Sequence, residues 1–187
     1  MKPIFIIEHL EPKMWEWCVI EYKNISKIVG AGNLWFTNVP LKDFAKVKKF
    51  GKVFSESVKE MKLENACLLD MESGEKLLPA DASKFNYFIF GGILGDNPPR
   101  KRTEEELTRF MKNAEIRNIG KSQFSTDSAV FVVSEICKGR KLEDIEFADE
   151  IKVKINKIES TSLPYKYPLR DGKPIISKEL IKYLKKH

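Results

Sequence analysis

The sequence has few of the residues that build metal centres and disulfide frameworks. Its 187 residues include only two histidines, His9 and His187, and three cysteines, Cys18, Cys67 and Cys137. The cysteines are odd in number, widely spaced and set in apolar stretches, where a free thiol behaves as a small hydrophobic group. These numbers exclude a Cys/His metal cluster. We therefore expect no metal, and a reducing cytoplasm as the compartment.

Long apolar runs are also missing. No stretch approaches the ~20 residues that a membrane-spanning helix needs, and the N-terminus lacks the layout of a signal peptide, so we expect no membrane partner. Hydrophobic residues make up 42% and charged residues 32%, which is typical of a globular chain of one domain with a small appendage. A formal net charge of +6 favours an anionic partner such as RNA or a ribosomal surface, although a soluble protein without such a partner can be equally basic.

Short apolar runs alternate with helical patterns until Gly139. Strands are expected at residues 4–7, 34–39, 66–70 and 85–90, and helices at residues 14–28, 44–61, 103–117 and 128–138. A Thr-x-x-Glu capping box at Thr103 marks the start of the third helix. The alternation predicts an α/β fold, an open parallel sheet with helices on both faces. After Gly139 the pattern changes to an edge strand (150–158) and a short basic helix (178–186), so we expect a core of residues 1–145 and an extension, 146–187, that packs on it.

Two loops carry residue types that suit a ligand site. The first, residues 90–103, has the sequence FGGILGDNPPRKRT and follows directly on an apolar strand. Its glycines leave bare backbone at the carboxyl end of a parallel strand, where ligands bind in such sheets. The spacing fits neither the dinucleotide-binding fingerprint nor a P-loop. A tight turn alone would explain the glycines and prolines, but a turn does not require Asp96 or Arg100.

The second loop, residues 119–130, has the sequence IGKSQFSTDSAV and leads into an apolar helix. The first backbone N–H groups of a helix have no partner within it, so this loop can receive an adenosine or a carboxylate. Ser125, Thr126 and Asp127 would serve equally well as a plain helix cap. Both interpretations stay open from the residues alone.

Together the two loops resemble the SPOUT-class family of predicted RNA methyltransferases whose fungal member modifies an arginine of a small-subunit ribosomal protein. The similarity rests on the run from Phe90 to Thr103 and on TDSAV at residues 126–130. The opening IEHL at residues 7–10, followed by Trp17, Glu21 and Tyr22, is similar to the family's N-terminus, and ESTSLPYKY at residues 159–167 to its C-terminal segment. The resemblance thus covers nearly the whole chain. It implies a SPOUT-type C-terminal trefoil knot, which general rules of chain topology make rare.

The resemblance also implies S-adenosyl-L-methionine as the methyl donor, bent inside the knot and held mainly by backbone groups of the two loops. The implied donor-binding residues are Leu69, Gly91, Gly92, Ile93, Leu94, Gly95, Ile119, Gly120, Gln123, Ser125, Thr126 and Asp127. Asp70, which ends a neighbouring strand, either approaches the ribose or is an ordinary turn residue.

The nature of the acceptor decides which other side chains are needed. Arginine is a cation with a pKa above about 12, so its pocket needs carboxylates, and Asp96, Glu8 and Glu159 are the candidates. Tyr165 or Tyr167 could stack on the guanidinium, and Arg100 completes the set of expected active-site residues.

An RNA acceptor would instead use basic residues near the first loop, Arg100 among them, to bind phosphates. A third possibility, a non-catalytic nucleotide-binding module of the ribosome, would keep the glycine loops but need neither Asp96 nor Arg100. The resemblance favours a methyltransferase that acts on an arginine of a ribosomal protein, with RNA as the alternative acceptor. Whether the enzyme is a monomer or a homodimer stays open.

Overall fold

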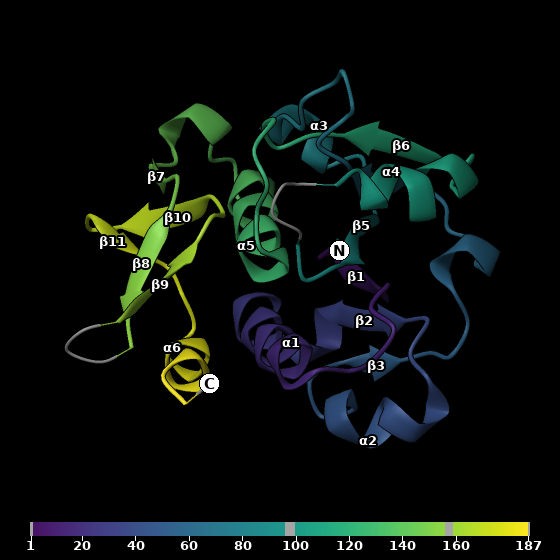
Figure 1. The fold of residues 1–187 in the computed structure, drawn as a ribbon. Helices are drawn as coiled ribbons and strands as arrows, with labels where there is room; N and C mark the ends of the chain where they lie inside the picture. The colour runs from purple at the N-terminus through teal and green to yellow at the C-terminus, as the bar shows by residue number, and fades with distance from the viewer. Residues whose placement is uncertain (1, 96–99, 156–158, 187) are drawn as a thin grey trace.

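The computed structural model describes residues 2–95, 100–155 and 159–186. At its centre lies a six-stranded sheet in the order β3-β2-β1-β5-β4-β6 (Figure 1). Its strands are β1 (Ile4–His9), β2 (Leu34–Thr37), β3 (Lys52–Val53), β4 (Ala66–Leu69), β5 (Tyr87–Gly92) and β6 (Ala114–Arg117). Every neighbouring pair is parallel, which confirms the predicted open parallel sheet. All carboxyl ends therefore lie at one edge, where ligands bind in sheets of this kind.

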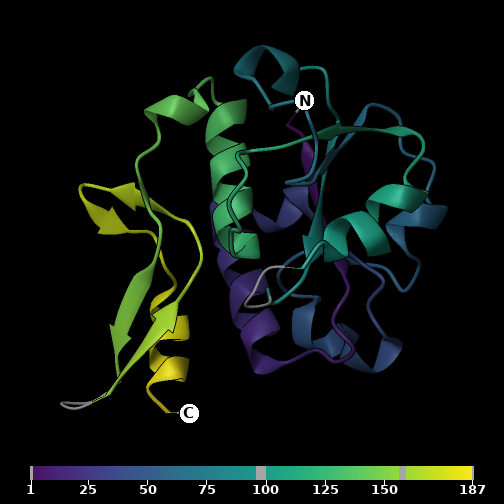
Figure 2. The same cartoon turned by 45° about the horizontal axis from the view of Figure 1, so that its top comes forward.

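Helices cover both faces of the sheet, as the alternating pattern predicts. One face packs against α1 (Glu16–Val29) and α5 (Thr126–Cys137), which lie side by side, with α2 (Phe44–Val47) and α3 (Pro79–Ala82) beside them (Figures 1 and 2). Phe5, Ile7 and Phe36 point to this face and belong to the larger hydrophobic core. The opposite face carries Ile6 and Leu68 and is covered by shorter elements: α4 (Arg102–Glu106) and the 3₁₀ turns η3 (Val58–Glu60) and η4 (Thr108–Phe110).

Two predicted helices are wrong, and each gives way to a strand at an edge of the sheet. The helix expected at residues 44–61 ends with α2, because the backbone of Gly51 lies so close to β2 that a Cβ there would be 2.5 Å from the Leu34 carbonyl oxygen. Residues 52–53 then pair with β2. The helix expected at residues 103–117 ends at Glu106, and residues 114–117 form β6, which pairs with β4. Helix α5 begins at Thr126, two residues earlier than predicted.

The elements after Ile145 build two small sheets of their own. They comprise β7 (Phe147–Ala148), β8 (Ile151–Lys154), β9 (Ser160–Leu163), β10 (Tyr167–Arg170), β11 (Lys173–Pro174) and α6 (Lys178–Leu184). Strands β7, β10 and β11 form one antiparallel sheet, and β8 and β9 form the other. This region packs against the outer side of α1 and α5 through α6 and β10 (Figure 2).

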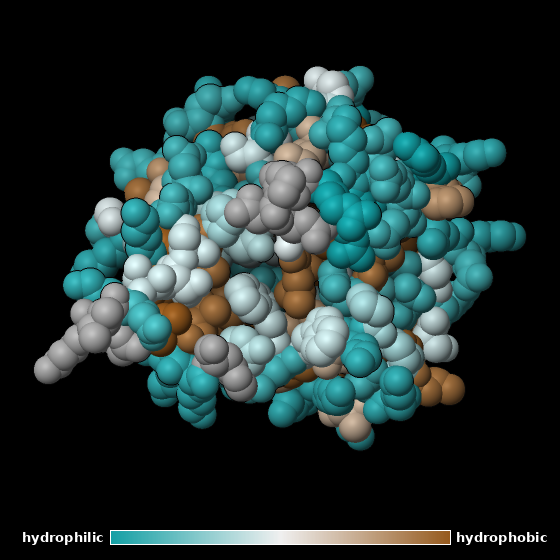
Figure 3. Space-filling model, viewed as in Figure 1, coloured by the Kyte–Doolittle hydropathy of each residue, from teal (hydrophilic) through white to brown (hydrophobic). Residues whose placement is uncertain are grey.

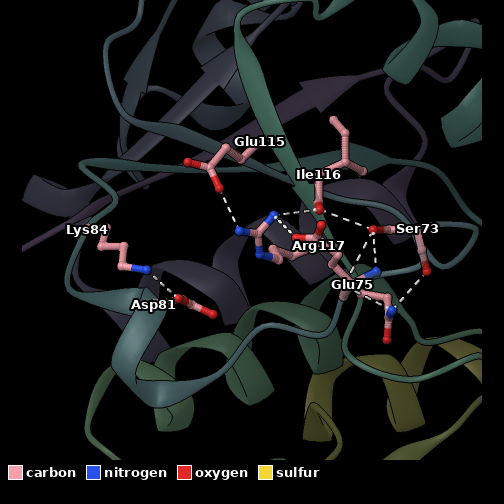
Figure 4. A network of polar contacts seen from close by, with 8 residues as sticks. Ser73, Glu75, Asp81, Lys84, Glu115, Ile116 and Arg117 are labelled. Carbon is pink, nitrogen blue, oxygen red and sulfur yellow. Dashed lines mark hydrogen bonds and ion pairs between the residues drawn. The ribbon is translucent and has the colours of Figure 1, made fainter.

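Strand β6 is tied to the loop that follows β4 by the guanidinium of Arg117. Its Nη1 atom lies 2.9 Å from the Glu75 carboxylate, and Nη2 lies 2.5 Å from Glu115 (Figure 4). The Ser73 hydroxyl donates to the Ile116 carbonyl in the same network. These bonds fix residues 70–75 beside the end of β6, which is one side of the site described below.

The surface seen in Figure 3 is hydrophilic over most of its area, with apolar side chains showing near its centre. Within the described residues, no helix is long and apolar enough to cross a membrane.

Candidate active site

A cavity opens at the carboxyl ends of β4, β5 and β6, where the two loops singled out in the sequence meet the start of α5. Its lining residues are Leu69, Asp70, Met71, Phe90, Gly91, Ile93, Gly95, Arg100, Arg102, Thr103, Ile119, Gly120, Ser122, Gln123, Phe124, Thr126 and Ala129. The strands bring these segments together because all of them run in the same direction. The wall combines apolar side chains, glycine backbone and a few polar groups, which is the usual character of a small-molecule site.

The cavity depends on glycine at three positions of its wall. A Cβ on Gly95 would come 2.2 Å from Nε2 of Gln123, and one on Gly91 would come 3.1 Å from Ile93 and 3.2 Å from the Thr103 hydroxyl. Gly95 also has a positive φ of 28°, and Gly120, at φ 109°, has a backbone conformation that L side chains rarely adopt. Glycine therefore keeps backbone groups accessible on both sides of the cavity.

Two polar groups of the wall are notable. The amide Nε2 of Gln123 is buried and has no hydrogen-bond partner within the part of the chain that the structure describes, and such a donor is costly unless a ligand or water satisfies it. Asp70 is held in place, because its Oδ2 accepts from the Thr108 hydroxyl at 2.6 Å and its Oδ1 from the backbone N–H of Glu72 at 2.9 Å.

Arg102 lines the cavity and is held by three hydrogen bonds. It donates to Glu11 at 2.8 Å, to Glu106 at 2.7 Å and to the Leu10 carbonyl at 3.0 Å. Burial opposes its charge, but the hydrogen bonds to Glu106 and Glu11 outweigh this and raise the pKa of Arg102 above its ordinary value. Glu11 also accepts from the backbone N–H of Leu94, so the arginine fixes the loop after β5.

Of the predicted donor-binding residues, the structure places eight on the cavity wall: Leu69, Gly91, Ile93, Gly95, Ile119, Gly120, Gln123 and Thr126. Gly92, Leu94, Ser125 and Asp127 do not line it. Gly92 serves packing, since a Cβ there would be 2.5 Å from the Tyr22 hydroxyl. Ser125 and Asp127 are buried and bonded to each other at 2.7 Å.

The predicted acceptor residues are spread more widely. Arg100 is exposed and lines the cavity, but Asp96 lies outside the described residues. Glu8 points to the opposite face of the sheet, where its carboxylate accepts from the Thr37 hydroxyl at 2.5 Å, the Ser57 hydroxyl at 2.5 Å and the Val58 N–H at 2.9 Å. Glu159 is exposed in the β8–β9 hairpin, and Tyr165 donates to the Gly95 carbonyl at 3.4 Å.

The sequence interpretation missed several wall residues, namely Met71, Phe90, Arg102, Thr103, Ser122, Phe124 and Ala129. Most of them lie inside the two loops, so their position was a usable signal. Thr103 was assigned to a helix cap, but the N-cap of α4 is Lys101, which makes no side-chain capping bond, and Thr103 lies within the helix.

The geometry is that of a nucleotide-type site at the end of a parallel sheet, and comparison with known proteins defines its class. A Trm10 structure from Thermococcus kodakaraensis has the same fold, with a TM-score of 0.61 at 16% identity over 76% of this chain and 96% of that one. The fold is therefore that of the SPOUT methyltransferases.

The particular family follows from closer relatives. Residues 4–187 match the family described as "Protein arginine N-methyltransferase SFM1-like". Protein arginine N-methyltransferase SFM1 of Saccharomyces cerevisiae is 38% identical over 97% of this chain and 94% of its own length. The crystal structure of the yeast enzyme complexed with SAM has a TM-score of 0.90 at 36% identity and covers 100% of this chain and 91% of that one. The chain belongs to the SFM1-like family, as the sequence resemblance indicates, and is a methyltransferase dependent on S-adenosylmethionine.

Proposed function

We propose that this enzyme transfers a methyl group from S-adenosylmethionine, bound in the cavity, to an arginine of a ribosomal protein in the cytoplasm. The observation that carries the proposal is the cavity itself, in which glycine backbone and apolar side chains meet at the ends of three parallel strands. Family membership supports the arginine acceptor, because the yeast relative is a protein arginine methyltransferase.

The residues of the cavity fit the donor. Leu69, Phe90 and Ile119 offer apolar surface for an adenine ring, and the Gly91 and Gly95 backbone allows close approach. The unpartnered Nε2 of Gln123 would gain an acceptor from the ligand. When bound, the donor supplies an electrophilic methyl group on a sulfonium. What this chain contributes is position, since the wall would hold the donor still relative to the acceptor.

Filling the cavity tests donor binding. Ala129 lies on α5 and faces the cavity, so Ala129→Leu adds bulk without disturbing a helix-forming position. We expect its dissociation constant for S-adenosylhomocysteine, measured by calorimetry, to rise at least about 10-fold, with the melting temperature little changed. The matched control is Ala80→Leu at the exposed end of α3, which should bind as wild type. Equal affinity in both variants would place the donor elsewhere.

Incubation of the enzyme with labelled donor and undermethylated ribosomes, followed by separation of protein from RNA, tests the acceptor. Label in the arginine of one ribosomal protein is the expected result. Label in RNA would instead support the alternative that the exposed Arg100 at the cavity permits.

A further inference from the structure

Next to the cavity lies a pair of buried carboxylates that the donor does not explain. Glu21 of α1 is 4% exposed and Asp127 of α5 is 3% exposed. Their helices pack side by side (Figure 2). The Asn24 amide, three residues after Glu21 on α1, donates to Asp127 at 2.8 Å, so the two carboxylates lie near each other. Within the described residues, no Lys or Arg forms an ion pair with either group. Two like charges without a cation, removed from water, are costly to the fold.

Each carboxylate accepts hydrogen bonds from groups of the fold, none of which carries a charge. Asp127 accepts from the Asn24 amide at 2.8 Å, the Ser125 hydroxyl at 2.7 Å and the Ser128 N–H at 2.9 Å. Glu21 accepts from the indole N–H of Trp17 at 2.9 Å. Burial raises the pKa of Glu21 well above its ordinary value, and the charge of Asp127 adds to this, with hydrogen bonds from Trp17 and Thr126 opposing it. Burial likewise raises the pKa of Asp127. A cation placed beside the two acids would therefore stabilise their charged forms.

A second and independent observation points to a ligand. Tyr167 of β10 is 1% exposed, and its hydroxyl has no hydrogen-bond partner within the described part of the chain. Burial is the main cause that raises the pKa of this phenol, the charges of Asp127 and Glu21 raise it further, and the nearby Ser125 hydroxyl opposes this. Tyr167 packs in one cluster with Trp17, which donates to Glu21, so the phenol lies beside the pair. A guanidinium presents five N–H donors in a plane, and two carboxylates with a phenol oxygen offer the acceptors to match.

The pair lies close to the cavity, although neither carboxylate lines it. Thr126 joins the two sites, because it lines the cavity and directly precedes Asp127. Tyr165 reaches the cavity wall, where its hydroxyl donates to the Gly95 carbonyl at 3.4 Å. The C-terminal region packs beside the pair, because Tyr167, Val153 and Leu163 form one hydrophobic cluster with Trp17 of α1.

We infer that Glu21, Asp127 and Tyr167 form the pocket that binds the guanidinium of the acceptor arginine, an inference that rests on the proposed function. In the transfer, one guanidino nitrogen forms a bond to the methyl carbon, and the carbon–sulfur bond breaks with its electron pair on sulfur. The nitrogen then releases one proton, so the methylated guanidinium keeps a single positive charge and the sulfur becomes neutral. The carboxylate pair takes up this proton and passes it to water.

The test uses the full chain and three conservative variants: Glu21→Gln, Asp127→Asn and Tyr167→Phe. With ribosomal protein as acceptor, both amide variants should lose at least about 100-fold in kcat/KM. Tyr167→Phe should raise KM about 5- to 10-fold. Affinity for S-adenosylhomocysteine should stay within about twofold of wild type. Glu16→Gln, on an exposed position of the same helix, is the matched control and should behave as wild type.

Stability separates this role from a structural one. The melting temperature of Glu21→Gln should equal or exceed that of wild type, because the amide removes a buried like charge, and Tyr167→Phe loses no hydrogen bond. If either variant melted at a lower temperature while its folded molecules kept the wild-type kcat/KM, the inference would be overturned.

Binding of a small probe keeps the inference separate from the proposed function. Methylguanidine, added with S-adenosylhomocysteine, should raise the melting temperature of wild type but not of Glu21→Gln. If wild type labelled only RNA, the proposed function would fail, and absence of methylguanidine binding would overturn the pocket as well. Equal binding by wild type and Glu21→Gln would overturn the pocket while leaving the proposed function standing.

Discussion

Two glutamates, Glu8 and Glu21, are both buried, at 0% and 4% exposure, yet their surroundings differ. Glu8 lies at the end of β1 and accepts three hydrogen bonds that join β1, β2 and η3. Glu21 lies on α1 near another carboxylate and accepts from the Trp17 indole N–H at 2.9 Å, with a smaller contribution from Thr126. Both are acids removed from water, but only Glu21 has a second buried carboxylate as its neighbour.

The difference suggests how a structural buried carboxylate can be told from a functional one. Hydrogen bonds from the fold stabilise the charged form of a buried carboxylate, and such a group has a structural role. A pair of carboxylates facing each other without a cation is kept at a cost to stability, which is a common sign of a functional site. The sequence could not make this distinction, because it gave Glu8 as a candidate acceptor residue without any sign of the hydrogen bonds that this carboxylate accepts within the fold.

The largest effect that would test this comparison is expected from Glu8→Gln. The amide presents an N–H₂ group where the hydroxyls of Thr37 and Ser57 and the N–H of Val58 need an acceptor. We expect a loss of about 2–4 kcal/mol in the free energy of unfolding, measured with urea. Methyl transfer per folded molecule should be unchanged. If Glu8→Gln were as stable as wild type but inactive, the roles of the two glutamates would have to be exchanged.

The pH dependence of stability should reveal the raised pKa values of Glu21 and Asp127. Glu21 and Asp127 have pKa values raised above their ordinary 4.5 and 3.8, so the folded state holds protons that the unfolded state has lost. Stability must therefore fall as pH rises from about 4 through the folded pKa values. Unfolding free energy measured between pH 4 and pH 8 should fall less steeply in Glu21→Gln than in wild type, with Glu16→Gln as the control. Parallel curves for all three proteins would contradict the raised pKa.

Most of the central sheet could be predicted because its strands are nearly continuous apolar runs. The two edges could not. Residues 114–117 alternate charged and partly buried side chains, and their pairing with β4 depends on contacts that no local pattern contains. Residues 52–53 likewise form a strand only because Gly51 allows the chain to approach β2. The trefoil knot implied by the family resemblance stays a prediction.

The cavity was foreseen better than the carboxylate pair, for a physical reason. The cavity wall comes largely from two contiguous loops whose glycines and polar residues are visible in the sequence. The pair joins one residue from each of two helices that are distant in the chain and meet only after folding. One signal was available: Glu21 is a charged residue on the apolar face that Cys18, Tyr22 and Ile25 define. A charge at such a position asks for an explanation.

The smallest expected effect comes from changing a supporting donor instead of a carboxylate. Asn24→Ala removes the 2.8 Å hydrogen bond to Asp127, which helps to lower the pKa of that carboxyl. Without it the pKa rises further, so a larger share of the pair is protonated at neutral pH. We expect the acid limb of kcat/KM to move to higher pH and activity at neutral pH to fall a few-fold, while stability changes by no more than about 1 kcal/mol. The matched control is Asn33→Ala, which removes a 2.9 Å bond to the Val29 carbonyl at the far end of α1 and should leave the pH profile in place. A purely structural Asn24 would lower stability and turnover equally at every pH, and an unshifted acid limb would then separate Asp127 from the binding of the acceptor.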